Sequence, residues 1–351
     1  MMLGISVYLQ ERIEEEKMRR FHQAGFCSIF TSLHIPEEDA TAYRTKLQLL
    51  GSIASGLKME LMADISTASM EKLALDWNAA EVVLDWGVTG LRIDYGIEDD
   101  VIIRLSQKMK VALNASTLTE DHLEKLLSGG LCTDNIEVWH NFYPRPETGL
   151  ASSDFLAKNM LFQSYGLKVQ AFIPGDRNLR GPLHQGLPTL EQHRAYGTFA
   201  AFTELKAYKV DKILIGDPDV TDEALLQLQE AADTITLRAK AAGDWTQAHR
   251  LLESGTHNRP DLARDVIRSE ESRMSGLFRD SQVPPFNCTE RKEGAITIDN
   301  DLYMRYKGEI QIARRTLPQD DKVNVIGQVV PEDMPLLNFI DGGRCFRIIW
   351  V

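Results

Sequence analysis

The sequence has few cysteines, and none of them stands in a pattern that forms a site. Cys27, Cys132, Cys288 and Cys345 are far apart and lack the C-x-x-C spacing of zinc and redox sites. We therefore expect reduced thiols that pack mostly as small side chains, as is usual in the cytosol. The eight histidines show no H-x-H or H-E-x-x-H spacing, so we expect no catalytic metal.

Several nucleotide and nucleophile motifs are absent as well. The sequence has no G-x-G-x-x-G after its first strand-like segment, no G-x-x-x-x-G-K-[ST] and no G-x-S-x-G. These gaps argue against a dinucleotide fold, a P-loop NTPase and a serine nucleophile. No apolar run approaches the roughly 18 residues of a membrane span, and MMLGISVYLQERIEEEK at the start lacks the apolar core of a secretory signal. We expect a cytoplasmic protein with no membrane partner.

Basic residues are outnumbered, with 39 Lys and Arg against 51 Asp and Glu, for a net charge of −12. Such a chain repels phosphate backbones over most of its surface, so we expect no nucleic acid partner, although a local basic pocket is compatible with this balance. The 43% hydrophobic and 26% charged content is ordinary for a globular protein. A length of 351 residues favours two domains, or one large barrel with an appended module.

From residue 3 to about 230, short apolar runs of period two alternate with longer amphipathic stretches. The predicted strands are 4–9, 27–33, 59–65, 90–94, 110–114, 136–141, 168–173 and 212–215. The predicted helices are 14–24, 40–55, 70–86, 99–107, 120–127, 153–165, 190–208 and 222–232. Glycine stands at the expected end of five helices, at positions 25, 56, 87, 130 and 166. This alternation predicts a (β/α)8 barrel, with an open doubly wound sheet as the main alternative.

The alternation of short apolar runs with amphipathic stretches ends after residue 232. Short strand-like segments follow at 295–298, 309–312, 323–330 and 344–351, with turn-forming residues at 299–301 and 341–343. We therefore predict an α/β protein with a TIM barrel over residues 1–232 and a separate β-rich domain over residues 233–351.

In a (β/α)8 barrel the active site lies at the carboxyl ends of the strands and in the loops that follow them. The polar residues that the sequence places there are Tyr8, His34, Asp64, Asp94, Asn114, His140, Asn141, Tyr143, Arg145, Glu147, Asp176, Arg177, Arg180, His184 and Gln185. Carboxylates supported by arginine and aromatic side chains are typical of sites for sugars and sugar phosphates.

These residues also have purely structural interpretations. Arg92 and Asp94 stand two apart on one strand face, so they can form an ion pair that lines the barrel. Asp64, like Asp94, is either a site residue or part of the scaffold. Glu147 follows two prolines that stiffen its loop, and it is either held for proton transfer or a solvated loop residue. The arginines after the seventh strand form either an anion pocket or an ordinary surface loop.

Seven segments together resemble a known family. They are GISVYLQ from Gly4, TSLHIPEED from Thr31, DIS from Asp64, LRIDYG from Leu91, HNFYPRPETGL from His140, FIPGDRNLRGPLHQGLPTLEQHR from Phe172 and ILIGDP from Ile213. Across essentially the whole chain the sequence resembles the bacterial 6-phospho-N-acetylmuramidase family, and the two longest segments are the most specific. The resemblance implies a TIM barrel followed by a cyclophilin-like β-barrel domain without prolyl isomerase activity.

The same resemblance implies a glycoside hydrolase without a cofactor. It would cleave the β-1,4 bond of N-acetylmuramic acid 6-phosphate–N-acetylglucosamine, a phosphorylated amino-sugar disaccharide, during cytoplasmic peptidoglycan recycling. Glycoside hydrolysis needs one protonated and one ionised carboxyl group, and a phosphorylated sugar needs an anion pocket. We assign Glu147 as the acid/base and Asp94 or Asp64 as the ionised partner. For the phosphate and the lactyl carboxylate we assign Arg145, Arg177 and Arg180.

Three questions stay open at this point. The mechanism can retain configuration, invert it or use the substrate's own acetamido group, and the chain can form a homo-oligomer. A sugar-phosphate lyase or isomerase on the same barrel would usually need a Schiff-base lysine or a metal, and no predicted strand end carries a lysine. A non-enzymatic carbohydrate-binding protein would leave the polar strand ends unexplained.

Overall fold

The structure, a computed structural model, describes residues 1–33, 40–73, 75–93, 96–231, 234–274 and 276–351. The chain forms two compact units, Met1–Leu225 and Leu226–Val351. The division falls inside helix α8, Asp222–Glu230, whereas the sequence analysis places it after residue 232.

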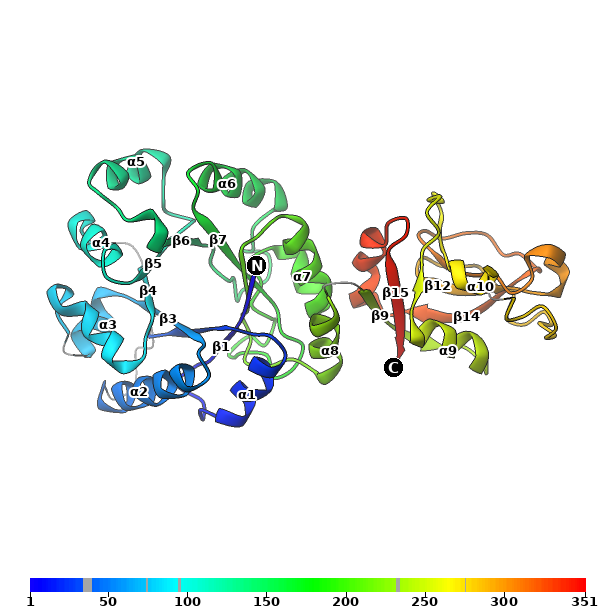
Figure 1. The fold of residues 1–351 in the computed structure, drawn as a ribbon, viewed down its shortest axis with the longest axis horizontal. Helices are drawn as coiled ribbons and strands as arrows, with labels where there is room; N and C mark the ends of the chain where they lie inside the picture. The colour runs from blue at the N-terminus through cyan, green and yellow to red at the C-terminus, as the bar shows by residue number, and fades with distance from the viewer. Residues whose placement is uncertain (34–39, 74, 94–95, 232–233, 275) are drawn as a thin grey trace. The chain divides into compact units, whose positions relative to one another are not determined.

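The first unit is a closed barrel of eight parallel strands in chain order (Figure 1). Strand β1 closes the ring because it pairs in parallel with β8 from Met2↔Lys212 to Ile5↔Ile215. The strands are β1 Met2–Ser6, β2 Ser28–Ser32, β3 Glu60–Ile65, β4 Gly90–Ile93, β5 Lys110–Asn114, β6 Ile136–Trp139, β7 Lys168–Ile173 and β8 Lys212–Ile215. The predicted (β/α)8 barrel is confirmed, and the open sheet is excluded.

Helices connect successive strands on the outside of this ring (Figure 1). They are α1 Glu15–Gln23, α2 Ala40–Gly56, α3 Thr67–Lys72, η1 Trp77–Trp86, α4 Asp99–Ser106, α5 Glu120–Ser128, η2 Thr133–Asn135, α6 Ser152–Ser164, η3 Glu191–Ala195, α7 Thr198–Ala207 and α8.

Two predicted helices are wrong as single elements. The stretch predicted over 70–86 divides because the Asp76 carboxylate accepts a hydrogen bond from the backbone N–H of Asn78 and caps a new 3-10 segment. The stretch predicted over 190–208 divides because the backbone of Tyr196 is extended, and Gly197 then caps α7. At four predicted helix ends, Gly25, Gly87, Gly130 and Gly166, φ is positive, so the chain turns there toward the next strand.

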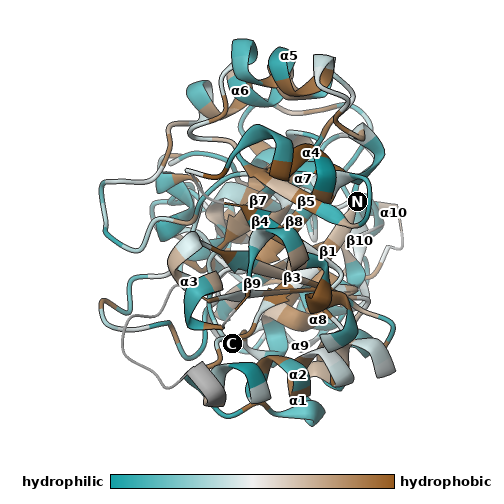
Figure 2. Ribbon diagram, turned by 90° about the vertical axis from the view of Figure 1, so that its left-hand side faces the viewer, coloured by the Kyte–Doolittle hydropathy of each residue, from teal (hydrophilic) through white to brown (hydrophobic). Residues whose placement is uncertain are grey.

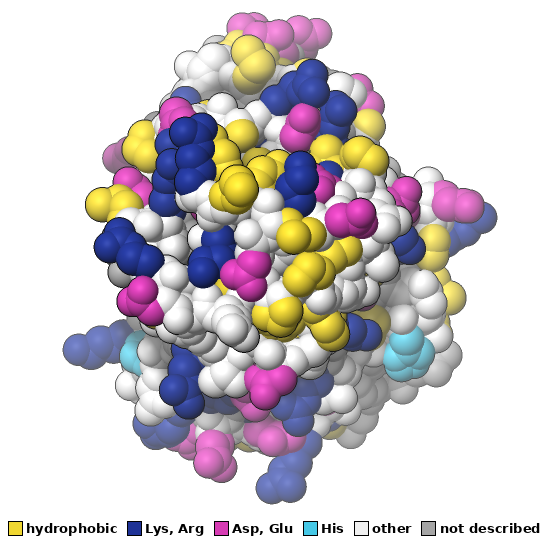
Figure 3. All heavy atoms as spheres, turned by 90° about the vertical axis from the view of Figure 1, so that its right-hand side faces the viewer, with side chains coloured by type: hydrophobic (Ala, Val, Ile, Leu, Met, Phe, Trp, Pro, Cys, Tyr) yellow, Lys and Arg dark blue, Asp and Glu magenta, His cyan; other side chains and the backbone are white. Residues whose placement is uncertain are grey.

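Apolar residues line the inside of both units, and polar residues cover much of the outside. In the ribbon coloured by hydropathy, brown is prominent on the central strands, and teal is common on outer helices such as α5 and α6 (Figure 2). The face of the molecule in Figure 3 carries basic, acidic and hydrophobic side chains intermixed. This distribution is the ordinary one for a protein with a net charge of −12 spread over its surface.

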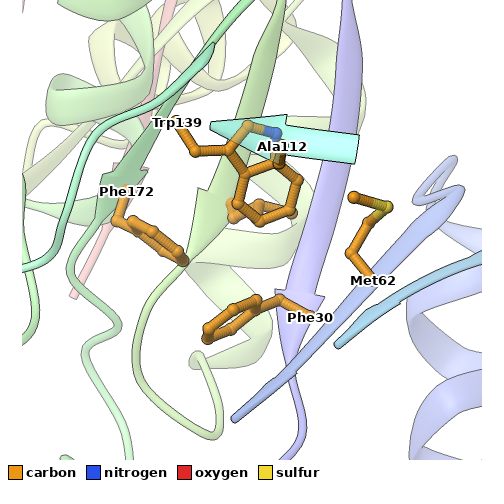
Figure 4. Close-up of a cluster of buried hydrophobic side chains, with 6 residues drawn as sticks. Phe30, Met62, Ala112, Trp139 and Phe172 are labelled. Atoms are coloured by element: carbon orange, nitrogen blue, oxygen red, sulfur yellow. The ribbon is translucent and has the colours of Figure 1, made fainter. Parts of the chain in front are cut away.

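The barrel interior is packed with large side chains. Phe30, Met62, Trp139 and Phe172 come from four strands and meet in one buried cluster with Ala112 and Leu214 (Figure 4). The Phe30 and Phe172 rings lie 5.3 Å apart between centroids, in an edge-to-face arrangement. Because side chains fill its interior, the barrel is a packed core and not a pore. It supports the residues at the carboxyl ends of the strands and in the loops that follow them, which we call the rim.

Charged groups close the opposite, amino-terminal end of the barrel. The Lys212 ammonium contacts carboxylate oxygens of Glu137 at 2.5 Å and of Glu60 at 2.6 Å, and all three side chains are buried. Lys110 contacts Glu60 at 2.5 Å. Burial alone would raise the pKa of Glu60, but the two lysines hold it below its usual value. The network ties the first residues of β3, β5 and β8 together with β6.

The second unit is a seven-stranded mixed sheet in the order β10-β15-β9-β14-β12-β13-β11. Its strands are β9 Thr234–Ala241, β10 Thr256–His257, β11 Val266–Arg268, β12 Ala295–Asp299, β13 Ile310–Ala313, β14 Val323–Val329 and β15 Cys345–Trp350. Its helices are α9 Thr246–Ser254, α10 Glu270–Met274, η4 Asp301–Tyr306 and η5 Pro331–Phe339. The predicted β-rich domain is confirmed, although the sequence analysis missed β9, which pairs on both sides. None of the described helices of the chain has the length and apolar character to cross a membrane.

Candidate functional site

The carboxyl ends of β3, β4 and β6 meet in one hydrogen-bonded network. The Arg92 guanidinium donates to the Asp64 carboxylate at 2.7 Å and, through its other terminal nitrogen, to the side-chain oxygen of Asn141. Asp64 and Arg92 are both buried, at 8% and 5% exposure. This charge-assisted hydrogen bond lies in a site that excludes most water. This network gives the rim one fixed negative charge beside one fixed positive charge.

A second cation lies on an aromatic surface at the ends of β1 and β7. The Arg180 guanidinium lies 3.7 Å from the centroid of the Tyr8 ring and 5.9 Å from that of Phe142. Tyr8 is fixed because its hydroxyl donates to the Gly216 carbonyl at 2.5 Å, and burial raises the pKa of that hydroxyl, so it stays protonated. Among the described residues, no carboxylate forms an ion pair with Arg180.

Asp217, after β8, organises the loop that carries Arg180. Its carboxylate accepts backbone N–H groups of Gly175, Arg180 and Leu187 at 2.9 to 3.0 Å. Burial raises the pKa of Asp217, although the three N–H donors and the nearby Arg180 guanidinium oppose that rise. The loop after β7 is therefore held at its two ends to one buried side chain.

Glu147 stands on the exposed loop after β6, and its backbone has a positive φ of 73°. Glu191 holds this turn, because its carboxylate accepts the N–H of Glu147 at 2.8 Å and the N–H of Gly149 at 2.7 Å. Arg194 in turn donates to both oxygens of Glu191 and to the carbonyl oxygens of Tyr143 and Gln185. We call Glu191 and Arg194 the rim clamp, because they join the loop after β6 to the loop after β7.

Three further predicted residues lie at this rim or on its loops. The Asn114 side-chain oxygen accepts the backbone N–H of Ser116 at 2.9 Å and so shapes the turn after β5. The Ser116 hydroxyl lies 3.4 Å from the Tyr143 hydroxyl, which links that turn to the loop after β6. The side chain of Arg145 is exposed on the same loop as Glu147.

Other predicted residues hold the scaffold. His140 is fully buried against Phe155, and its Nε2 lies 2.7 Å from the Asn159 side-chain oxygen on α6, so its ring faces the surrounding helix. Burial lowers the pKa of His140 to about 4, which keeps the ring neutral. Asp176 accepts the backbone N–H and the hydroxyl of Thr221 at 2.7 and 2.8 Å, just before α8.

The remaining loop residues after β7 have separate surroundings. Arg177 is half exposed, and its Nε lies 4.0 Å from Asp219, a carboxylate that also contacts Arg20 of α1 at 3.3 Å. His184 is exposed, and its Nδ1 lies 2.6 Å from the Leu179 carbonyl oxygen, while the side chain of Gln185 is exposed. The predicted His34 and Asp94 lie outside the described residues.

The structure thus brings together Tyr8, Asp64, Asn114, Asn141, Tyr143 and Arg180 around the barrel rim, with Glu147 on the loop above β6. Glu191 is the rim residue that the sequence analysis missed, because it falls inside a stretch predicted as one long helix. Pro188 gives no signal against this interpretation, because proline is tolerated at the start of a helix. Within the described residues, no three His, Cys, Asp or Glu side chains are grouped so that they can hold a metal ion.

Comparison with known proteins decides the family. The family model described as "6-phospho-N-acetylmuramidase, N-terminal" matches residues 3–230, and the one described as "6-phospho-N-acetylmuramidase, C-terminal" matches residues 235–349. The chain belongs to the 6-phospho-N-acetylmuramidase family. The two matched segments meet between residues 230 and 235, just after α8.

Two solved structures resemble this 6-phospho-N-acetylmuramidase family member over nearly its whole length. A conserved Enterococcus faecalis protein of unknown function is 37% identical, covers 100% of this chain and 96% of its own, and superposes with a TM-score of 0.88. An uncharacterized B. cereus protein is 25% identical, covers 99% of both chains and has a TM-score of 0.74. No functionally curated protein matches the chain. The family name describes a glycosidase, and the two solved relatives share the fold.

Proposed function

We propose that the protein hydrolyses the β-1,4 bond between N-acetylmuramic acid 6-phosphate and N-acetylglucosamine. Membership of the 6-phospho-N-acetylmuramidase family supports a glycosidase with a phosphorylated sugar substrate. The observation that carries the proposal is the rim itself, which combines the buried Asp64 carboxylate with an arginine, Arg180, that forms no direct ion pair with a described carboxylate. Cytoplasmic peptidoglycan recycling, where a phosphorylated disaccharide arises, is the setting that we propose.

Arg180 is our choice for the phosphate group. A guanidinium offers two parallel N–H donors to a phosphate, and stacking on the Tyr8 ring orients that fork before the substrate arrives. Phe142, partly buried above the packed barrel interior, offers an apolar surface of the kind that contacts sugar rings. Arg177 contributes less in this proposal because Asp219 lies beside it.

Glu147 and Asp64 are our choice for the two carboxyl groups. In this proposal Glu147 gives its proton to the glycosidic oxygen as the bond to the anomeric carbon breaks, which frees N-acetylglucosamine. Water supplies the hydroxyl at the anomeric carbon and its remaining proton restores the acid, so that the reaction is a balanced hydrolysis. Asp64, paired with Arg92, stabilises the positive charge that develops on the sugar ring or orients the acetamido group.

The decisive experiment offers the purified protein the phosphorylated and the unphosphorylated disaccharide at equal concentration, with products read by mass spectrometry. We expect N-acetylmuramic acid 6-phosphate and N-acetylglucosamine from the first substrate and little product from the second. Cleavage of neither would remove the glycosidase proposal. Equal cleavage of both would keep the glycosidase and remove the phosphate site.

Arg180→Met tests the phosphate contact. We expect kcat/KM for the phosphorylated disaccharide to fall by about tenfold to a hundredfold, because a charge-assisted, partly desolvated hydrogen-bond pair is lost. Its matched control is Arg177→Met in the same loop. Because Arg177 lies beside Asp219, we expect this variant to lose less than threefold in kcat/KM. A larger loss in the control than in Arg180→Met would move the phosphate contact to Arg177.

A further inference from the structure

The second unit contains a hollow of about 410 Å³ that the proposed function does not use. This volume lies within the range of small-molecule sites and exceeds what a single phosphate needs. The hollow lies between α10, η4 and the start of β13, and its lining includes Arg273, Phe278, Arg279, Arg305, Lys307 and Glu309. Four of these six side chains are cationic.

Two of the four cations have acidic partners. The Arg273 guanidinium lies 2.5 Å from the Glu309 carboxylate, and the Lys307 ammonium lies 3.5 Å from Asp301. Lys307 also donates to the backbone carbonyl of Arg279 at 3.2 Å, so it fixes the loop that carries that arginine. These two ion pairs leave this part of the lining with little net charge.

The other two cations, Arg279 and Arg305, have no carboxylate partner among the described residues. Arg305 donates to the Tyr306 hydroxyl at 2.6 Å, and its guanidinium lies 4.8 Å from the centroid of the same ring. Arg273 lies 5.5 Å from that centroid, so one tyrosine orients two guanidiniums. In a chain with a net charge of −12, two uncompensated arginines facing one hollow are a local reversal of sign.

The floor of the hollow is apolar and closely packed. Phe278 is buried, at 5% exposure, and Gly308 packs directly on it with a positive φ of 86°. A Cβ atom at Gly308 would lie 2.5 Å from the Phe278 Cβ, so only glycine allows this approach. An aromatic floor under a ring of donors suits a ligand with one apolar face and one anionic group.

We propose that this hollow is a binding site for the phosphate group of a small phosphorylated molecule, with Arg279 and Arg305 as its two ligands. Two guanidinium forks match the three oxygens of a phosphate monoester and its double negative charge. The remaining volume and the Phe278 floor take the organic part, for which a monosaccharide has a suitable size. The proposal does not depend on the reaction at the barrel rim.

Methionine-methyl NMR on the full chain tests the site, because Met304 lines the hollow. The Met304 signal is assigned with Met304→Leu, and the probes are glucose 6-phosphate, inorganic phosphate and uncharged glucose at constant ionic strength. We expect glucose 6-phosphate to shift this signal saturably and glucose to leave it unchanged. A similar affinity for inorganic phosphate would show that the phosphate alone is recognised, whereas tighter binding of glucose 6-phosphate would show that the floor holds the sugar.

Variants separate this site from the barrel rim. Arg279→Gln and Arg305→Gln should each weaken the Met304 response at least tenfold, and Arg180→Met should leave it unchanged. Arg264→Gln, in an exposed pair with Asp265, is the matched control and should bind like the wild type. An unshifted Met304 signal, or a shift that survives loss of both arginines, would overturn the proposal. Neither result would bear on hydrolysis of the disaccharide, which is measured separately.

Discussion

Glu147 is the single residue on which the proposed chemistry depends most. A general acid contributes typically 10²- to 10⁴-fold to a rate, so Glu147→Gln should lower kcat for the phosphorylated disaccharide by that amount while leaving the fold intact. The amide keeps the size of the side chain and removes its proton. Glu223→Gln, an exposed glutamate in the first turn of α8, is the control and should keep the wild-type rate. A near-normal rate for Glu147→Gln would assign the acid to another carboxyl group.

Asp299, in the second unit, makes a residue-level prediction about pH. Burial, and then the nearby charges of Glu309 and Asp320, raise its pKa to about 7, while Arg291 opposes the rise. The folded state thus holds a proton that the unfolded state releases near pH 4, so stability falls as the pH rises from about 4 to 7.

Asp299→Asn should abolish this fall, because the amide cannot ionise. We expect the variant to exceed the wild type in unfolding free energy at pH 8, by up to about 4 kcal/mol for three pKa units, and to differ little at pH 4. Urea unfolding at both pH values measures this, with the exposed Asp280→Asn as control. Parallel pH profiles for wild type and Asp299→Asn would contradict the prediction.

At the scale of elements, the rim clamp joins two loops that are distant in sequence, since Glu191 stands 44 positions after Glu147. The pKa of Glu191 is lowered to about 2, mainly by the hydrogen bonds from Arg194. The N–H groups of Glu147 and Gly149 lower it further, whereas burial opposes the shift. A depressed pKa means that the clamp contributes its stability above the ordinary glutamate pKa and loses it only as the pH falls toward 2. The clamp therefore stays ionised across the whole range in which an acid/base profile is measured.

Arg194→Gln tests whether this clamp positions Glu147. We expect kcat to fall about tenfold to a hundredfold with a smaller change in KM, because a displaced acid weakens the transition state more than substrate binding. Arg194→Lys should recover only part of the loss, since an ammonium cannot pair with both Glu191 oxygens. Arg19→Gln removes an exposed pair with Glu15 and serves as control. A change in KM alone would make the clamp a substrate contact.

Strand positions could be predicted because buried parallel strands are short apolar runs between turns. The predicted 110–114, 168–173 and 212–215 coincide with β5, β7 and β8. Helix continuity could not be predicted in the same way, since the pattern around Asp76 and Tyr196 stays apolar where the backbone leaves the helix. Strand β9 was missed because its alternation, TITLRAKA, includes four polar residues and begins just after the helix predicted over 222–232.

The rim could be predicted only in part, for a similar reason. Strand ends are visible in sequence, so Asp64, Asn141 and Arg180 could be proposed from position alone. Which of them touch is decided by the barrel, since Arg92 reaches Asn141 across 49 positions of sequence. His140 follows a strand end as closely as Asn141 does, yet alternation along β6 turns it toward α6.

For the barrel as a whole, closure brings Lys212 of the last strand against Glu60 and Glu137 from the middle of the chain. Lys212 is 2% exposed, so its removal leaves two buried carboxylates whose remaining cationic partner among the described residues is Lys110. Breaking a buried pair of this kind typically costs about 3–5 kcal/mol, because the remaining charge keeps its desolvation penalty without its partner.

Lys212→Met should therefore lower the unfolding free energy of the first unit by about 3–5 kcal/mol at pH 7.5. The loss should shrink as the pH falls toward 4, because protonation of the stranded carboxyl groups removes the uncompensated charge. Lys168→Met is the matched control, since Lys168 is also the first residue of a barrel strand but is exposed, and a change within about 0.5 kcal/mol is expected there. Urea unfolding followed by far-UV circular dichroism gives both values. Equal losses in the two variants would mean that the ion pairs of Lys212 with Glu60 and Glu137 add nothing to closure of the barrel.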